Sequence, residues 1–103
     1  MSTVATKAST CVVLGTRART SAIDLLGDVP PGGQADLLVL GVYPTEGQRR
    51  VTEQALALAA ERRFVLTAAL VTRPEELVDV TQRAATLRIV ADRRERRFWG
   101  LGR

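Results

Sequence analysis

Arginine and hydroxyl side chains gather in the segment Gly15–Ser21 (GTRARTS), which follows an apolar run and precedes a candidate helix. Arginine binds phosphate and carboxylate groups through paired hydrogen bonds, and helix N-termini attract anions. The segment therefore predicts an anion site built from Arg17, Arg19, Thr20 and Ser21. It lacks both the G-x-G-x-x-G and the G-K-[ST] patterns of nucleotide-binding loops. A solvated turn that caps a helix accounts for the same residues without a ligand.

The second candidate surface is the C-terminal segment at residues 92–103, which combines five arginines with two adjacent aromatic residues. Arginines neutralise phosphates and aromatic rings stack on unpaired bases, so nucleic acid is one class of partner that fits. The same residue types are enriched in protein interfaces, and adjacent exposed aromatic rings need cover. We favour a latch onto the body of the domain, or an interface with a protein partner or a second copy. The residues concerned are Arg93, Arg94, Arg96, Arg97, Phe98, Trp99 and Arg103.

A third group of hydroxyl side chains lies in Gly41–Gln48 (GVYPTEGQ). Tyr43 and Thr45 are expected at the carboxyl edge of a sheet, where open α/β folds bind ligands. The segment is also explained without chemistry, because Tyr43 can finish a strand, Pro44 can set the turn and Thr45 can cap the next helix. We prefer this structural interpretation.

Composition excludes several kinds of site. The chain has no histidine and one cysteine, so a Ser-His-Asp triad, a Cys-His pair, a zinc site and an intramolecular disulfide are ruled out within it. Cys11 lies in a β-branched run and is expected to pack as a small apolar group. The sequence therefore predicts no catalytic residue, no cofactor and no metal. Fourteen of the fifteen basic residues are arginine, a bacterial-like bias expected from a GC-rich coding sequence.

Apolar runs alternate with helical patterns along the chain and predict one small α/β domain. The order βαβαβαβ favours a mostly parallel sheet with right-handed crossovers. The first three strands are expected in the interior of the sheet and the last at an edge. The predicted strands are Thr10–Leu14, Ala35–Tyr43, Phe64–Val71 and Leu87–Ala91.

Three helices are expected between these strands. The first starts at a Ser21 cap and ends at Gly27, and the second starts at a Thr45–Gln48 capping box and runs to about Arg62. The third follows Thr72 or Arg73, with Leu77, Val80, Thr81 and Ala84 on its inner face. We divide the chain into a flexible leader at 1–9, the α/β domain at 10–91 and an Arg/aromatic tail at 92–103.

A partial resemblance to a known family covers about residues 37–71. A strand ending in Gly-Val-Tyr-Pro-Thr, then Glu-Gly-Gln, a helix and a further strand is similar to the start of the serine-recombinase (resolvase) catalytic domain. That family typically has Gly-Tyr-x-Arg-x-Ser at the end of the strand. Here the tyrosine is displaced, no arginine or nucleophilic serine stands at the matching positions, and Thr45 is the nearest hydroxyl. The resemblance therefore implies a relative unable to transfer strands, and no catalytic residue is carried over.

These observations favour a non-catalytic interaction module that binds a protein partner, or self-associates, through its C-terminal segment. The alternatives are a nucleic-acid-binding accessory protein and a small domain that binds an anion or nucleotide. No segment reaches the roughly 18 apolar residues of a membrane span, and no signal-peptide core is present, so a cytoplasmic protein without membrane contact is expected.

Overall fold

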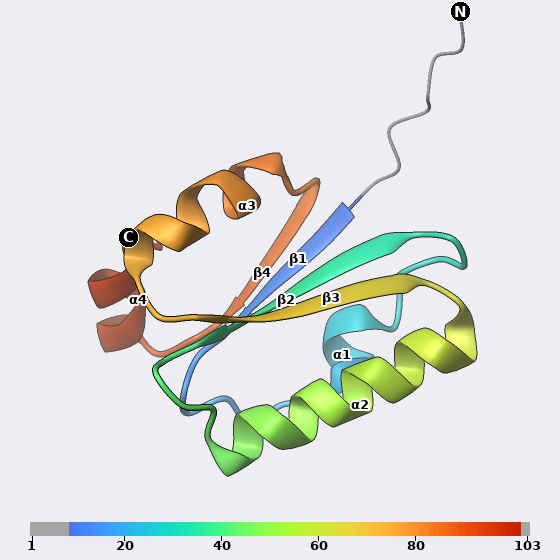
Figure 1. The fold of residues 1–103 in the computed structure, drawn as a ribbon, viewed down its shortest axis with the longest axis horizontal. Coiled ribbons are helices and arrows are strands. Elements are labelled where there is room, and N and C mark those ends of the chain that lie inside the picture. The colour runs from blue at the N-terminus through green and yellow to red at the C-terminus, as the bar shows by residue number, and fades with distance from the viewer. Residues whose placement is uncertain (1–8, 102–103) are drawn as a thin grey trace, which may run out of the picture.

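The computed structural model describes residues 9–101, which form a single sheet of four parallel strands in the order β3-β2-β1-β4 (Figure 1). The predicted α/β architecture, parallel sheet and alternation of strands and helices are confirmed. The leader predicted at 1–9 lies outside the described residues, except for Ser9, which begins β1. The strands are β1 (Ser9–Leu14), β2 (Gln34–Leu40), β3 (Val65–Val71) and β4 (Thr86–Val90).

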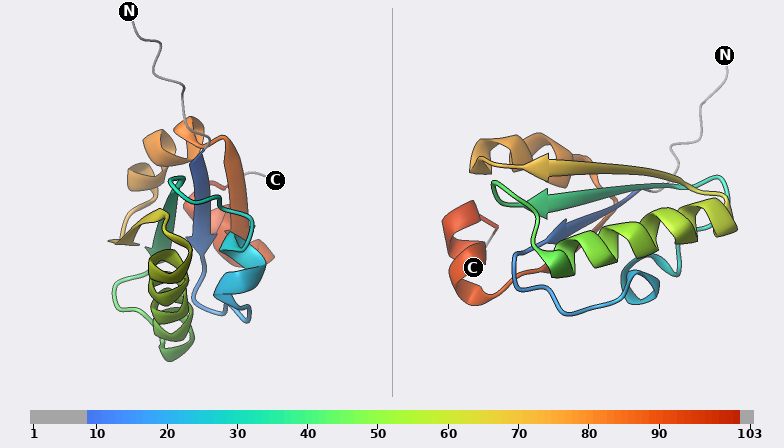
Figure 2. Two further views of the ribbon diagram at one scale, coloured as in Figure 1. Left: turned by 90° about the vertical axis from the view of Figure 1, so that its right-hand side faces the viewer. Right: turned by 60° about the horizontal axis from the view of Figure 1, so that its bottom comes forward.

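The helices are distributed over both faces of the sheet (Figure 2). Helices α1 and α2 cover one face, and the 3-10 turn η1 with helices α3 and α4 lies against the other. Their bounds are α1 (Ala22–Leu26), α2 (Glu46–Arg62), η1 (Pro74–Leu77), α3 (Val78–Arg83) and α4 (Arg93–Trp99). Helix α4 was not among the predicted elements; it forms from the segment that we expected as a tail.

Two hydrophobic cores follow from the alternation of side chains along the central strands. On the α1/α2 face, Leu14 and Leu37 pack with Val51 of α2. On the opposite face, Val13 and Leu40 pack with Leu77 and Trp99. Both sides of β1 and β2 are therefore apolar, as the near-continuous hydrophobic runs in their sequences predict.

The strand predicted over Ala35–Tyr43 is too long at its C-terminal end. Strand β2 ends at Leu40, and Gly41 has a φ of 129°, a backbone conformation that side chains with a Cβ rarely adopt. The chain therefore turns at Gly41, and Tyr43 lies beyond the strand with 81% of its surface exposed. The prediction that Tyr43 finishes the strand is wrong.

The prediction that Phe64–Val71 forms an interior strand is also wrong. Strand β3 begins at Val65 and is the end strand of the sheet in the described chain. Most of its side chains are exposed, although Val71 is buried at its C-terminal end. An apolar run of this length is equally compatible with an interior and an edge strand, because sequence periodicity contains no information about neighbouring strands.

The helix termini follow the sequence closely at α2 and less closely elsewhere. Thr45 and Gln48 form the predicted capping box, and α2 ends at Arg62. Ser21 occupies the N-cap of α1 but its side chain makes no capping hydrogen bond. The third predicted helix is divided into η1 and α3, with Pro74 in the first turn of η1.

One buried amide joins the two central strands to α2. Gln48 is the one buried polar or charged residue within residues 9–101. Its Nε2 donates to the backbone oxygens of Leu14 at 3.0 Å and Leu40 at 2.9 Å. Its Oε1 accepts from the backbone N–H of Thr45 at 2.8 Å. A single side chain thus satisfies backbone groups at the ends of β1 and β2 and at the start of α2.

We expect Gln48→Leu to lower the free energy of unfolding by about 2–4 kcal/mol, because two buried carbonyls and one N–H lose their partners. Chemical denaturation of the variant beside the exposed control Gln82→Leu measures this. The control is expected to change stability by less than about 0.5 kcal/mol. Equal stability of the two variants would contradict the role given to Gln48.

Candidate functional site

The carboxyl edge of the sheet brings together two segments that are far apart in the sequence. Strands β1 and β4 are parallel neighbours, so the loop after β1 lies beside the start of α4 (Figure 1). The backbone N–H of Gly15 donates to the backbone oxygen of Val90 at 2.7 Å. Strand β2, which follows β1 in the chain, pairs on one side of β1, and the later strand β4 pairs on the other side. The carboxyl ends of β1 and β4 therefore form a topological switch point, where open α/β sheets commonly bind ligands.

Glu95 of α4 occupies this position. Its Oε2 accepts the backbone N–H of Thr16 at 2.8 Å and the Thr16 hydroxyl at 2.7 Å. Its Oε1 is buried and has no hydrogen-bond partner among the described residues. A Cβ added at Gly15 would lie 2.5 Å from this oxygen, so glycine at position 15 allows the carboxylate to approach the backbone. An external anion at the Thr16 N–H would have to displace Glu95.

A second contact joins the same two segments. Asp92 caps α4, since its Oδ1 accepts the backbone N–H of Glu95 at 2.8 Å. Its other carboxylate oxygen lies 3.7 Å from an Nη atom of Arg17, an ion pair exposed to solvent. The charge of Arg17 is therefore partly balanced by the first turn of α4.

The predicted anion-binding residues are divided by the structure. Arg17 and Arg19 line a shallow hollow of about 490 Å³ together with Arg50 of α2. Ser21 lies at a different hollow, beside Ala22 and Gln54 between α1 and α2. Thr20 does not line either hollow. The residues around the first hollow are Thr16, Arg17, Ala18, Arg19, Gly47 and Arg50.

The sequence analysis did not predict Arg50 as a site residue. It belongs to the first turns of α2, which begin close to the carboxyl end of β2. Since β1 and β2 are parallel neighbours, the segments that follow them meet at the same edge of the sheet. Recognising that pairing would have placed Arg50 near Arg17 and Arg19.

Helix α4 divides the predicted Arg/aromatic residues into an inner and an outer set. Trp99 is 8% exposed and packs in the core, and Leu101 packs against the same cluster. Arg96 donates to the backbone oxygens of Ala91 at 3.2 Å and Ile89 at 3.0 Å. The latch expected from the sequence consisted of Phe98, Trp99 and Leu101; Trp99 and Leu101 pack on the body of the domain, whereas Phe98 is exposed.

The outer set of residues on α4 consists of arginines around the ring of Phe98. Phe98 is 70% exposed and meets Trp99 edge to face, with ring centroids 5.5 Å apart and an interplanar angle of 79°. Arg94 and Arg97 lie four and one positions before Phe98, and Arg94 shares its helix face. Arg93, Arg94, Arg97 and Phe98 are all exposed. Arg103 lies outside the described residues.

The remaining candidates from the sequence have structural roles. The Thr45 hydroxyl accepts the backbone N–H of Gln48 and donates to the backbone oxygen of Thr16 at 3.3 Å. Cys11 is fully buried, as expected, and burial followed by the negative charge of Asp36 raises the pKa of its thiol to about 11. The thiol is therefore protonated at neutral pH and unreactive.

Among residues 9–101, no group of three His, Cys, Asp or Glu side chains is placed to hold a metal ion. The helices of the same range are too short or too polar to cross a bilayer.

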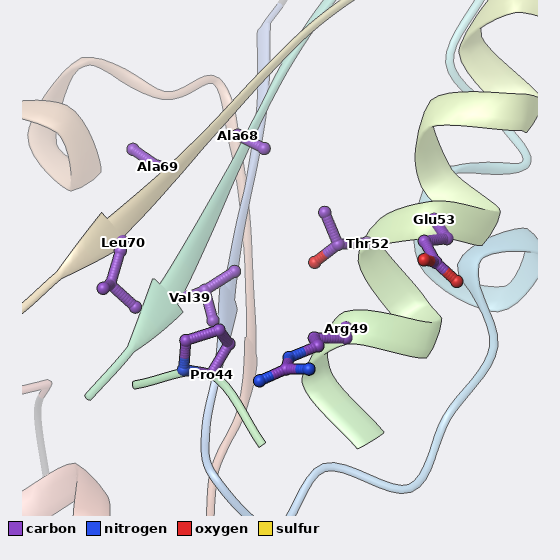
Figure 3. A pocket seen from close by; sticks show the side chains of 8 residues that line it. All are labelled: Val39, Pro44, Arg49, Thr52, Glu53, Ala68, Ala69 and Leu70. Atoms are coloured by element: carbon purple, nitrogen blue, oxygen red, sulfur yellow. The ribbon is translucent and has the colours of Figure 1, made fainter. Parts of the chain in front are cut away.

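A further apolar pocket of about 260 Å³ lies between α2 and the edge strand β3 (Figure 3). Leu70 and Ala68 of β3 line one side, and Arg49, Thr52 and Glu53 of α2 line the other. No residue of this pocket was predicted as a site, because β3 was expected in the interior of the sheet.

Comparison of the chain with models of protein families, with curated proteins and with solved structures found no match. The resemblance to serine recombinases consequently stays a prediction from the sequence.

We expect Gly15→Ala to lower the free energy of unfolding by about 1–3 kcal/mol, because its Cβ would collide with Glu95 Oε1 and with the backbone oxygen of Val90. Glu95→Ala in the same chain removes the first collision and leaves the second. Chemical denaturation of both single variants and the double variant should therefore show a smaller loss than the sum of the two single losses.

Gly47→Ala is the matched control for this cycle. A Cβ at position 47 meets the backbone oxygen of Ala18 at 3.5 Å, an ordinary contact, within the first turn of α2. It should leave stability unchanged or slightly increase it. Strictly additive losses for Gly15→Ala and Glu95→Ala would show that Glu95 does not hold the position described.

Proposed function

We propose that this protein is a non-catalytic interaction module that binds a protein partner through the outer face of α4. The observation that carries the proposal is the contrast between two adjacent rings: Trp99 is buried in the core, while Phe98 points away from it and is exposed. An exposed phenylalanine on a rigid support, flanked by arginines, is a typical composition of the energetic centre of an interface.

The contacts that hold α4 on the domain reduce the entropic cost of binding through this helix. The helix is capped by Asp92, attached to the β1–α1 loop through Glu95, and packed through Trp99. A binding residue that is already ordered loses less conformational freedom in a complex than one on a flexible tail. Phe98 and its neighbouring arginines are thus presented in one arrangement.

The charge of this face indicates the chemistry of the partner. Arg93, Arg94 and Arg97 are exposed on α4, and the two acidic residues nearby are engaged, Glu95 with Thr16 and Asp92 with Arg17. Two copies that met through α4 would bring arginines against arginines, which is unfavourable. A partner with an apolar pocket surrounded by carboxylates fits the face better than a second copy does.

We infer the absence of catalysis from the chemical groups that the protein contains. The sequence has no histidine, and the single thiol is buried and protonated at neutral pH. The hydroxyls of Thr16 and Thr45 are engaged with the backbone or with Glu95. The Thr16 hydroxyl donates to the Glu95 carboxylate, but the same carboxylate oxygen also accepts the backbone N–H of Thr16, which is the pattern of a structural contact between α4 and the loop after β1.

A photo-crosslinking amino acid placed at Phe98 should capture the partner in cells, whereas the same group at exposed Ile23 on α1 should not. With the captured protein purified, Phe98→Ala and Arg94→Glu/Arg97→Glu should each weaken binding about tenfold or more. Arg83→Glu, on α3, is the control and should bind normally. Equal capture from both positions, or full affinity of the α4 variants, would refute the proposal.

A nucleic acid is the second candidate partner, and one specific observation favours it. Arg17, Arg19 and Arg50 come from two separate segments and converge on one hollow, and Arg17 also contacts the start of α4. Together with the arginines of α4 they make the carboxyl edge of the sheet basic. Phosphates along a strand could be neutralised by such a surface without choice of sequence.

If nucleic acid is bound, the affinity for a fluorescent single-stranded oligonucleotide should fall steeply with salt. Arg19→Ala and Arg50→Ala should each make the slope of log affinity against log salt shallower by about one phosphate contact. Fluorescence anisotropy across a salt series measures this, with Arg62→Ala at the far end of α2 as control. Affinity that does not change with salt would exclude this candidate.

A further inference from the structure

The two edges of the sheet are protected very differently. At β4, Arg96 donates to the backbone oxygen of Ile89, and Val90 O accepts from Gly15, so successive carbonyls of this strand are bonded on opposite sides. Strand β4 also carries Arg88, which forms a two-pronged contact with Asp28 at 2.9 and 2.6 Å. Charged side chains at an edge discourage pairing with another strand.

Strand β3 has none of these protections. Its seven residues, VLTAALV, include no charged residue, no proline and no glycine. Val65 is 58% exposed and Leu70 is 43% exposed. A long, uncharged and apolar edge strand is the kind of edge on which another strand pairs.

The hydrogen bonds at the ends of β3 show which of its backbone groups face outward. Val65 donates to Gly33 O at 2.9 Å and Val71 O accepts from Gly41 at 2.9 Å, so residues 65 and 71 are directed toward β2 and its flanking loops. Because backbone groups alternate between the two sides of a strand, those of Leu66, Ala68 and Leu70 are directed away from β2. These three residues present a row of donors and acceptors at the edge.

The sequence of β3 is nearly the same in both directions about Ala68. Val65 corresponds to Val71, Leu66 to Leu70 and Thr67 to Ala69. An antiparallel strand that pairs about Ala68 would therefore meet each residue with its own kind, and Thr67–Ala69 is the single mismatch. A two-fold axis places residue 66 against residue 70 and residue 70 against residue 66, so the two halves of the strand must fit each other, and the apolar pairs formed here meet that condition.

We propose that β3 pairs antiparallel with β3 of a second copy about a two-fold axis at Ala68, which joins the two sheets into one. The backbone groups of Ala68 are directed away from β2 and its side chain is small, so its two copies can exchange both backbone hydrogen bonds at the axis. Leu66 of each copy then lies opposite Leu70 of the other, on the face that carries α2.

The pocket between β3 and α2 suits this occupant. It is lined by Leu70, Ala68 and the apolar atoms of Val39 and Pro44, and it lies between α2 and the edge strand β3 (Figure 3). Leucine side chains of the second copy would extend this apolar surface. Arg49 and Glu53 line the same pocket with one charge of each sign, so two copies would meet without net repulsion.

The pairing is independent of the proposed function. Helix α4 packs through Trp99 on the sheet face opposite α2, whereas Leu66 and Leu70 of β3 lie on the face that carries α2, so the proposed strand pairing does not use Phe98 or its arginines. It also assigns self-association to a surface other than the C-terminal segment favoured by the sequence.

Analytical ultracentrifugation of the full chain should give a mass of about twice 11.2 kDa. Ala68→Lys and Ala68→Glu should each give the mass of one chain, because the axis brings like charges together. An equimolar mixture of these two variants should return to the doubled mass, since lysine then faces glutamate. Thr86→Lys on β4 is the matched control and should remain doubled.

Ala68→Pro provides a second variant that removes one outward N–H and no hydrogen bond to β2, so it should fold and sediment as one chain. Circular dichroism checks the fold of each variant. A wild-type mass of one chain at every concentration would overturn the proposal. So would a dimer that persists in Ala68→Lys and Ala68→Glu, or one that dissociates only in Phe98→Ala.

Discussion

The hydrogen bonds of Gln48 are the constraint on which the arrangement of this domain depends. Two parallel strands end side by side, and their last carbonyls need donors that a neighbouring strand no longer supplies. The amide of Gln48 provides both bonds and accepts one from the turn that precedes α2. It thereby sets where the segments after β1 and β2 leave the sheet, and so brings Arg50 to the same hollow as Arg17 and Arg19.

A second constraint, the position of the Glu95 carboxylate against Gly15, decides which face of the C-terminal segment is directed toward the domain. Once Glu95 and Trp99 are directed inward, the helical period turns Phe98 and Arg94 outward. A segment that is uniformly rich in arginine in the sequence thus acquires an inner face that secures the domain and an outer face that is free to bind. The proposed partner surface is a consequence of this division.

The sheet also has to manage its two edges. Backbone groups at an edge are satisfied by water in a monomer but remain available to another strand. At β4 the guanidinium of Arg96 covers an edge carbonyl, whereas the apolar, nearly symmetric β3 is left open. The same four-stranded architecture therefore contains one edge with a covered carbonyl and one edge suited to pairing, and α4 with its proposed partner surface packs on the sheet face opposite α2.

The sequence by itself determined the alternation of strands and helices, the parallel sheet, the capping box of α2 and the burial of Cys11, because these depend on local periodicity and on residues close along the chain. Only the tertiary structure decided that β3 is an edge strand, that β2 stops at Gly41, that Arg96 and Trp99 point inward, and that Arg50 joins Arg17. Each of these depends on which elements become neighbours. Strand order and contacts between distant segments are set by packing in three dimensions, which the spacing of apolar residues does not encode.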